Sequence, residues 1–290
     1  MNALVRHKNE LLKEFHDTLG IATASILSSQ DSHQQKAQRV NAAATAVKGR
    51  LAAKIQQLPI ATRTDHSLVL QYCFSVASIE YRHKVWQYEY MAFSRRVGEL
   101  WEAFCSAAWD FPNRQGVKRL TIPTFAAVRQ TLQTRLQKNI GAHQNKAEIS
   151  TDIDILFEII GEINMIEDEV FSVDNIPHVI DFKSGFGSNE KGNMLRLQTV
   201  GKAYRIWNHQ TRLMLLVRQD QNNNYLKVLK RTGLWEVHTG ANAYRQISDL
   251  TGANVEEIRK HIIDWPGDLS QDFYRFLKGQ RTDLTSYLVW

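Results

Sequence analysis

The stretch Glu167–Asn193, EDEVFSVDNIPHVIDFKSGFGSNEKGN, decides how the second half of this chain is expected to fold. Two segments rich in apolar residues, Met165–Val173 and His178–Ser184, flank the dipeptide Asp174-Asn175, which favours a tight turn. The stretch therefore predicts two neighbouring strands that are followed by a glycine-rich loop.

The second of these strands carries charge among apolar neighbours. Strand alternation places Val179, Asp181 and Lys183 on one face, and Ile180 and Phe182 on the other. A carboxylate and an ammonium in such a strand are costly to desolvate. The fold must compensate for this cost, either with a structural ion pair or with a functional site.

A second acid, Asp168, lies one strand earlier and could approach Asp181 across the turn. Two carboxylates that point together repel each other unless a cation lies between them. Together with a neighbouring main-chain carbonyl, here that of Phe182, they form the oxygen set that Mg²⁺ prefers. A lysine beside that metal can orient or deprotonate an attacking water and stabilise negative charge on phosphorus. The pattern predicts metal-dependent phosphodiester hydrolysis, with Lys183 as that lysine.

These residues resemble the motifs of the PD-(D/E)xK nuclease superfamily, and within it those of the type II restriction endonucleases. Asp181-Phe182-Lys183 matches the (D/E)xK element, and Glu167-Asp168 stands where the Pro-Asp element would be. The helical motif Arg96–Phe104 looks like the opening helix that carries an acidic residue. Leu234–Gly252 resembles a strand-then-helix passage of restriction enzymes. The resemblance covers roughly residues 89–108 and 150–250.

The resemblance implies a Mg²⁺-dependent, sequence-specific endonuclease that cleaves double-stranded DNA to 5′-phosphate and 3′-hydroxyl ends. It also implies a homodimer whose two-fold axis matches a palindromic site. Asp168 and Asp181 would be catalytic and hold the metal with the Phe182 carbonyl, and Lys183 would assist the attacking water. Glu102 or Glu99 would supply a third acid, although either residue also fits a solvated helix face paired with arginines.

The sequence departs from the family pattern in one respect, because no proline precedes Asp168. Other candidates for the first metal carboxylate are therefore Asp152, Asp154 and Asp174. Two further functions stay open on the same residues. One is a nuclease of repair or recombination without strict sequence recognition, and the other is a DNA-binding module in which Asp181 and Lys183 form a structural ion pair.

Charge is distributed unevenly along the chain. Residues 1–146 hold 20 Lys and Arg against 10 Asp and Glu, whereas the remainder holds 16 against 20. The first half is thus expected to attract a polyanion such as DNA. The residues predicted to contact DNA are Ser188, Asn189 and Lys191 in the glycine-rich loop, and Arg114, Gln115, Lys118 and Arg119 in the basic loop 110–121.

The overall pattern predicts an α+β protein with a large helical N-terminal half and a small mixed sheet flanked by helices, as in a restriction-endonuclease-like core. We expect a helical region over 1–88, and a nuclease core over 89–290 with a basic helical insertion at about 110–145. Apolar runs at Arg212–Arg218, Tyr225–Lys230 and Leu234–His238 predict further strands.

The composition is that of a globular protein, with 43% hydrophobic and 23% charged residues. No apolar run approaches the length of a membrane span, and the first residues lack the apolar stretch of a signal peptide. Two cysteines provide no disulfide framework. We therefore expect a protein of the reducing cytoplasm that does not bind membranes.

Overall fold

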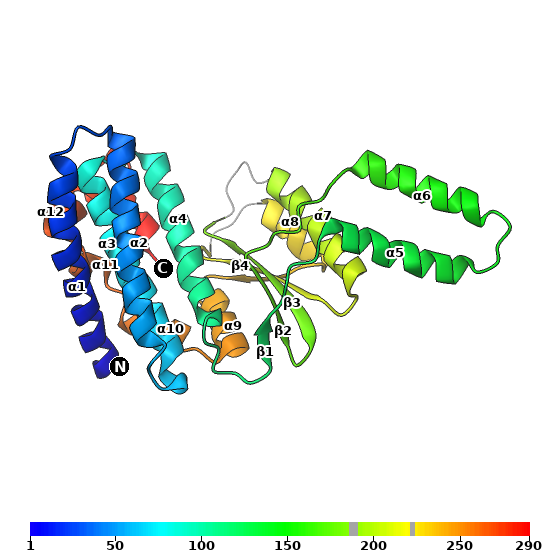
Figure 1. Ribbon diagram of the computed structural model, residues 1–290, viewed down its shortest axis with the longest axis horizontal. Helices are drawn as coiled ribbons and strands as arrows, with labels where there is room; N and C mark the ends of the chain where they lie inside the picture. Colours follow the sequence, from blue (N-terminus) through cyan, green and yellow to red (C-terminus); the bar gives the residue numbers. More distant parts are fainter. Residues whose placement is uncertain (186–190, 221–223) are drawn as a thin grey trace. The chain divides into compact units, whose positions relative to one another are not determined.

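The computed structural model describes residues 1–185, 191–220 and 224–290 (Figure 1). The chain forms two compact units, of which unit 1 comprises Met1–Gln115 and Tyr244–Trp290, and unit 2 comprises Gly116–Ala243. Unit 1 is helical, and unit 2 contains a small mixed sheet with helices. The predicted α+β class is therefore confirmed. Within the described part of the chain, no helix is both long and apolar enough to cross a membrane.

Unit 1 is built around three long helices. Its elements are α1 (Asn2–Leu27), α2 (His33–Ile55), α3 (Ile60–Val85), α4 (Tyr90–Ser106), η1 (Ala107–Trp109), most of α9 (Ala241–Thr251), α10 (Val255–His261), α11 (Trp265–Asp268), α12 (Gln271–Lys278) and η2 (Leu284–Leu288). Helices α1 and α2 both pack on α3, and most of the residues from Leu68 to Tyr81 in α3 are buried. The helix α3 thus forms the centre of this unit.

The C-terminal segment returns to this unit and is held there by polar contacts. Lys8 Nζ lies 2.8 Å from Asp268 Oδ2, and Tyr72 donates a hydrogen bond of 2.7 Å to the same oxygen. Trp101 Nε1 in α4 donates to Tyr244 OH at 2.8 Å. All three contacts lie within unit 1, which includes α4 and the C-terminal helices, whereas the predicted helical region ended at residue 88.

Unit 2 contains a five-stranded sheet in the order β1-β2-β3-β4-β5. Its elements are β1 (Val117–Arg119), α5 (Phe125–Ile140), α6 (Lys146–Ile160), β2 (Glu169–Val173), β3 (Ile176–Lys183), α7 (Lys191–Trp207), β4 (Arg212–Val217), α8 (Asn224–Thr232) and β5 (Glu236–Thr239). The strands β1, β2 and β3 are antiparallel, whereas β4 and β5 run parallel to β3. The pairing between neighbouring strands therefore changes from antiparallel to parallel at β3.

The turn between β2 and β3 follows the sequence prediction. Asp174 and Asn175 have φ values of 52° and 67°, as a two-residue hairpin turn of the right twist requires. The turn fixes a register in which Glu169 lies opposite Ile180 and Val170 opposite Val179. The predicted basic loop 110–121 is in part a strand, because β1 pairs with β2 along its whole length.

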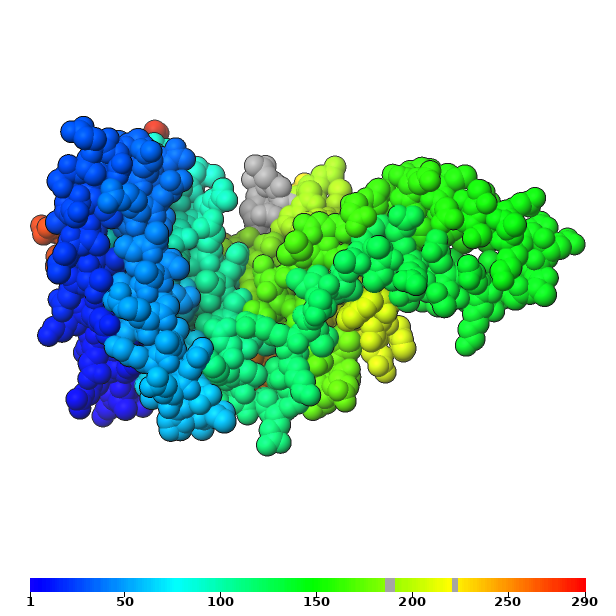
Figure 2. Space-filling view, viewed as in Figure 1, coloured from blue at the N-terminus to red at the C-terminus, as the bar shows by residue number. Residues whose placement is uncertain are grey.

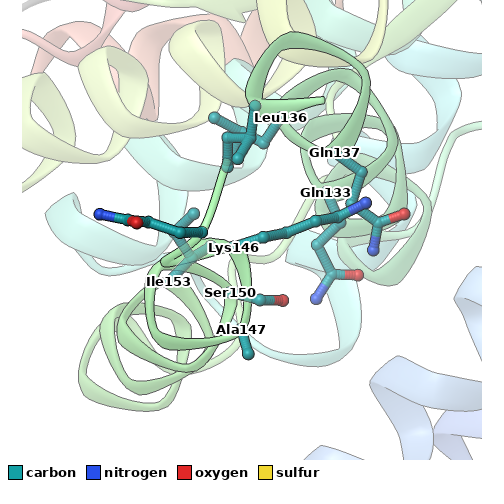
Figure 3. A pocket seen from close by; sticks show the side chains of 9 residues that line it. Gln133, Leu136, Gln137, Lys146, Ala147, Ser150 and Ile153 are labelled. Carbon is teal, nitrogen blue, oxygen red and sulfur yellow. The ribbon is translucent and has the colours of Figure 1, made fainter. Parts of the chain in front are cut away.

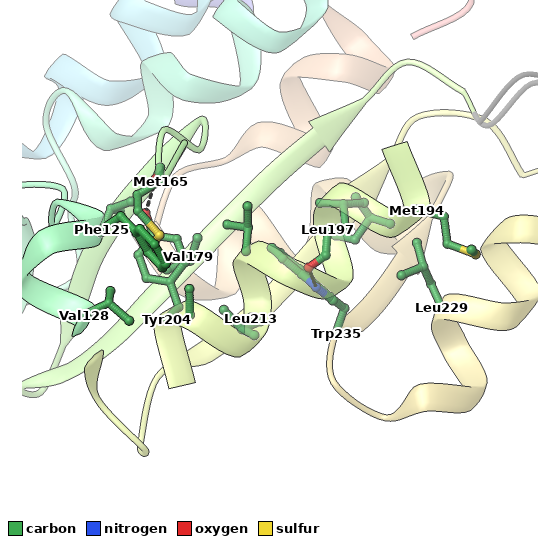
Figure 4. Packing of buried hydrophobic residues seen from close by; sticks show 14 of the residues in the cluster. Phe125, Val128, Met165, Val179, Met194, Leu197, Tyr204, Leu213, Leu229 and Trp235 are labelled. Atoms are coloured by element: carbon green, nitrogen blue, oxygen red, sulfur yellow. Dashed lines mark hydrogen bonds between the residues drawn. The ribbon is translucent and has the colours of Figure 1, made fainter. Parts of the chain in front are cut away.

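One face of the sheet is covered by α5, α7 and α8. Val179 and Leu213 of the strands pack with Leu197 of α7 and Leu229 of α8 (Figure 4). Two buried hydrogen bonds connect α7 to neighbouring segments of unit 2. Tyr204 OH donates to Met165 O at 2.6 Å, and Trp235 Nε1 donates to Leu197 O at 2.8 Å.

Helices α5 and α6 form a hairpin that projects beyond the rest of unit 2 (Figure 2). A cavity of about 470 Å³ lies between the two helices and is lined mainly by Gln133, Leu136, Lys146 and Ile153 (Figure 3). The predicted helical insertion ended at about residue 145. In the structure, α6 follows and extends the helical segment to Ile160.

The strand predicted over Tyr225–Lys230 is wrong, since these residues lie in α8. Leu226 and Leu229 are buried at a spacing of three residues, while Lys227 and Lys230 are exposed. This spacing fits a helix that packs one apolar face against α7. A run of only six residues contains too few turns for the sequence to distinguish the two periods.

The buried centre of unit 2 leads to a stability prediction. Leu215, in β4, is fully buried, and its truncation in Leu215→Ala should lower the free energy of unfolding of unit 2 by about 2–5 kcal/mol. Val228→Ala in α8, where the side chain is 37% exposed, should change it by less than about 1 kcal/mol. Urea unfolding followed by circular dichroism measures both values. Equal values for the two variants would contradict the packing described above.

Candidate active site

The predicted acid pair meets at the end of β3. Asp168 is the residue before β2, and the β2–β3 register, extended by one step, places it opposite Asp181. The carboxylate of Asp168 accepts a hydrogen bond of 2.6 Å from the main-chain nitrogen of Phe182. The side chain of Asp168 is thereby fixed against the (D/E)xK tripeptide.

Asp181 is buried between two cations. Its residue is only 2% exposed, and its two oxygens form ion pairs with Lys183 and with Arg196 of α7. Lys183 Nζ also donates to Phe182 O at 2.9 Å. The side chains of Asp181 and Lys183 therefore share one face of the strand, as its alternation predicts.

Arg196 also binds a third acid. Its Nη1 lies 2.6 Å from Glu167 Oε1, and its Nη2 lies 3.4 Å from Glu167 Oε2. Its Nε donates to Asn193 Oδ1 at 3.3 Å. The guanidinium thus bridges two acids, Glu167 and Asp181, that approach it from different segments of the chain. Neither Arg196 nor Glu167 was predicted as a site residue, because nothing in the spacing along the chain connects α7 with the acids.

The cluster shifts the pKa values of its members. Burial, a hydrogen bond with Asp181 and the charge of Asp181 raise the pKa of Glu167 to about 9, although Arg196 opposes the shift. Burial and the charge of Asp181 also raise the pKa of Asp168. Burial by itself would lower the pKa of Lys183, but the charge and hydrogen bonding of Asp181 outweigh it and raise that pKa. Burial and the neighbouring acid thus outweigh the effect of the cations on the pKa values of Glu167 and Asp168.

The structure separates the other candidates for the first metal carboxylate from this cluster. Asp152 and Asp154 lie on α6, where Asp154 accepts a hydrogen bond of 2.7 Å from Gln133 of α5. Asp174 lies in the turn at the opposite end of the β2–β3 hairpin. At about 3.4 Å per residue, the strands place this turn roughly 20 Å from Asp168. Among these four acids, Asp168 is the one next to Asp181.

The two glutamates of the predicted opening helix lie on α4 in unit 1. Glu99 pairs with Arg95 at 3.0 Å and with Arg96 at 3.3 Å, which is the solvated-face alternative that its spacing allowed. Glu102 is half-buried on the same helix. A catalytic role for Glu102 stays a prediction.

The predicted DNA contacts fall at several places. Arg119 in β1 makes two hydrogen bonds to Glu169, of 3.1 and 2.9 Å, and the neighbouring Lys118 is exposed. Arg114 donates to Asp249 O at 3.1 Å within unit 1, where Gln115 is the last residue before the boundary. Lys191 is the first residue of α7. Ser188 and Asn189 lie outside the described residues.

The donor set suits a hard divalent cation. Asp168, Asp181 and the Phe182 carbonyl are all oxygen donors. Asp181 Oδ1 is buried and pairs with Lys183 without accepting a hydrogen bond of regular geometry in the described part of the chain. Across residues 1–185, 191–220 and 224–290, no group of three or more acidic, His or Cys side chains is arranged to hold a metal. A metal bound here would therefore use two carboxylates and a main-chain oxygen.

Comparison of the chain with protein-family models, with curated proteins and with solved structures finds no match. The functional assignment therefore depends on the residues and the geometry described above.

The raised pKa of Glu167 leads to a prediction about pH. A carboxyl group that binds its proton more tightly in the folded state makes the fold less stable as pH rises from about 4.5 to about 9. Glu167→Gln keeps an oxygen acceptor for Arg196 but cannot ionise. It should match the wild type near pH 4 and exceed its free energy of unfolding at pH 9 by a few kcal/mol, at about 1.4 kcal/mol per pKa unit.

Urea unfolding at pH 4, 7 and 9 measures this difference, with Glu158→Gln on the exposed face of α6 as a matched control. The control should follow the wild type at each pH. Parallel pH profiles for wild type and Glu167→Gln would show that Glu167 is ionised in the folded protein.

Proposed function

We propose that this protein is a Mg²⁺-dependent endonuclease of the PD-(D/E)xK type that cleaves double-stranded DNA, and that it acts as a type II restriction enzyme. The observation that supports this proposal most strongly is the meeting of Asp168, Asp181 and Lys183 at the end of β3. The small mixed sheet of unit 2 is also the kind of core that the resemblance implies.

In the proposed hydrolysis, each residue of the site has a separate role. Asp168, Asp181 and the Phe182 carbonyl would hold Mg²⁺, which when bound lowers the pKa of a water and neutralises charge on the phosphate. Lys183 would orient the attacking water and stabilise the negative charge that develops on phosphorus. Arg196 keeps the carboxylates of Asp181 and Glu167 in position. Attack by water at phosphorus would leave 5′-phosphate and 3′-hydroxyl ends, as the resemblance implies.

Binding of DNA would come from exposed basic side chains. Lys118 and Lys191 are exposed cations of unit 2, at β1 and at the start of α7 respectively. Contacts of such side chains with phosphates position a duplex, while side chains that reach base edges provide specificity. A homodimer would present two copies of the site to the two strands of a palindrome.

One observation favours a second candidate, a DNA-binding module without catalysis. Both oxygens of Asp181 are already paired with cations of the same chain, as a purely structural ion pair would be. In that case the cluster would stabilise unit 2 and have no role with Mg²⁺. Cleavage assays with conservative variants separate the two candidates.

The nuclease proposal predicts the behaviour of two variants. Asp181→Asn removes a metal-binding charge, and Lys183→Gln removes the cation that stabilises the transition state. Lys183→Gln should lower the rate of cleavage by about 100- to 1,000-fold, and Asp181→Asn by at least as much. Both variants should still bind duplex DNA in Ca²⁺. The measurement is digestion of unmodified phage and plasmid DNA in Mg²⁺ and in EDTA, analysed by gel electrophoresis.

Asp152→Asn and Asp154→Asn are matched controls, since they remove the same charge from α6 and should cleave normally. Discrete fragments would indicate a restriction enzyme, and a smear a nuclease without sequence recognition. If Asp181→Asn and Lys183→Gln both cleave DNA at the wild-type rate, the active site lies elsewhere. If the wild type leaves all unmodified templates intact in Mg²⁺, the DNA-binding module is the better account.

A further inference from the structure

Helices α7 and α8 are rich in basic residues. Neither helix contains Asp or Glu, and together they carry seven Lys and Arg residues. One of these, Arg196, points to the acid cluster. The other six define the α7–α8 basic surface: Lys191, Lys202, Arg205, Lys227, Lys230 and Arg231.

Some cations on other helices are paired with an acid of the same helix. Arg6 pairs with Glu10 on α1, and Lys260 pairs with Glu256 on α10, each at helical spacing. Within the described ranges, none of the six residues of the α7–α8 basic surface takes part in an ion pair. No described acid is close enough to form an ion pair with these side chains, so they are available to an anion that approaches them.

Part of this surface is hollowed into a pocket of about 520 Å³. Its lining residues are Gln198, Lys202 and Arg205 of α7, and Thr232, Gly233 and Leu234 of the turn after α8. The three α7 residues are spaced four and three apart, so they lie on one face of the helix. Arg205 donates one of its N–H groups to His209 O at 2.9 Å, which fixes the direction of the guanidinium.

The chemistry of the lining indicates an anion with several oxygen acceptors. Lys202, Arg205 and the amide of Gln198 are hydrogen-bond donors, and two of the three are cationic. The described residues that line the pocket include no carboxylate that would repel an anion and no aromatic ring on which a base could stack. A phosphate group meets these requirements, whereas a nucleobase does not.

The pocket is separate from the acid cluster. Lys202 and Arg205 follow Arg196 by six and nine residues, which at 1.5 Å per residue corresponds to about 9 and 14 Å along the helix axis. Arg196 is directed to Asp181, while Lys202 is exposed. A phosphate in the pocket is therefore a different group from the one that the acid cluster would attack.

We propose that this pocket binds a phosphate of the DNA backbone, several nucleotides away from the bond that is cleaved. This inference rests on the proposed function and adds a second place at which the protein would hold the DNA. Each strand of duplex DNA carries one charge per about 3.4 Å of its axis, so a strand that passes over α7 presents phosphates at a spacing much shorter than the distance between the two sites. The contact adds affinity and register but no base specificity.

The test compares two variants with the same loss of charge. Lys202→Gln/Arg205→Gln removes the cations of the pocket, and Arg275→Gln/Lys278→Gln removes two cations at the same spacing from α12. Fluorescence anisotropy with a labelled 30-base-pair duplex in EDTA, over a range of NaCl concentrations, measures the binding constant. The slope of its logarithm against the logarithm of salt concentration should be smaller by about 1 for the pocket variant, because one phosphate contact is lost, and unchanged for the control.

The same proteins are assayed for cleavage in Mg²⁺, so that the two proposals can fail separately. If the pocket variant binds with wild-type affinity and slope while the wild type cleaves DNA, the pocket inference is wrong and the nuclease proposal stands. If the slope falls as expected but the wild type cleaves no template, the pocket binds DNA and the nuclease proposal is wrong. A wild type that binds no duplex at low salt overturns both.

Discussion

The candidate site depends on a single buried charge, that of Asp181. An ionised carboxylate with almost no exposure to water is stable only when cations or hydrogen-bond donors surround it. Lys183 from the same strand and Arg196 from α7 provide these cations, and Arg196 in turn holds Glu167. The geometry of four ionisable side chains therefore follows from the need to compensate one of them.

The sheet topology brings these partners together. The strand β3 pairs antiparallel with β2 on one side and parallel with β4 on the other. Because β2 and β3 are antiparallel, Asp168 at the start of β2 lies beside the end of β3. Because β3 and β4 are parallel, a crossover segment must connect them, and this segment contains α7 with Arg196. Residues before and after β3 in the chain thus meet where the strand ends. The same helix also carries Lys202 and Arg205, which line a pocket away from the acid cluster.

Several features could be predicted because they depend on neighbouring residues. The turn at Asp174-Asn175 follows from the tolerance of these residues for positive φ, and the shared face of Asp181 and Lys183 follows from the two-residue period of a strand. Other features required contacts between distant segments. Helix α8 resembled a strand because the packing of Leu226 and Leu229 decides its period, and the pairing of Arg196 with Glu167 joins residues that are 29 positions apart.

The sequence by itself determined the α+β class, the β2–β3 hairpin and the tripeptide Asp181-Phe182-Lys183, because each depends on residue preferences and periodicity over short distances. Only the tertiary structure placed Asp168, one of four candidate acids, next to Asp181, placed Arg196 between Glu167 and Asp181, and included α4 and the C-terminal helices in unit 1. The physical reason is that burial and charge compensation act through space. A side chain finds the partner that the folded backbone brings within reach, whatever their separation in the chain.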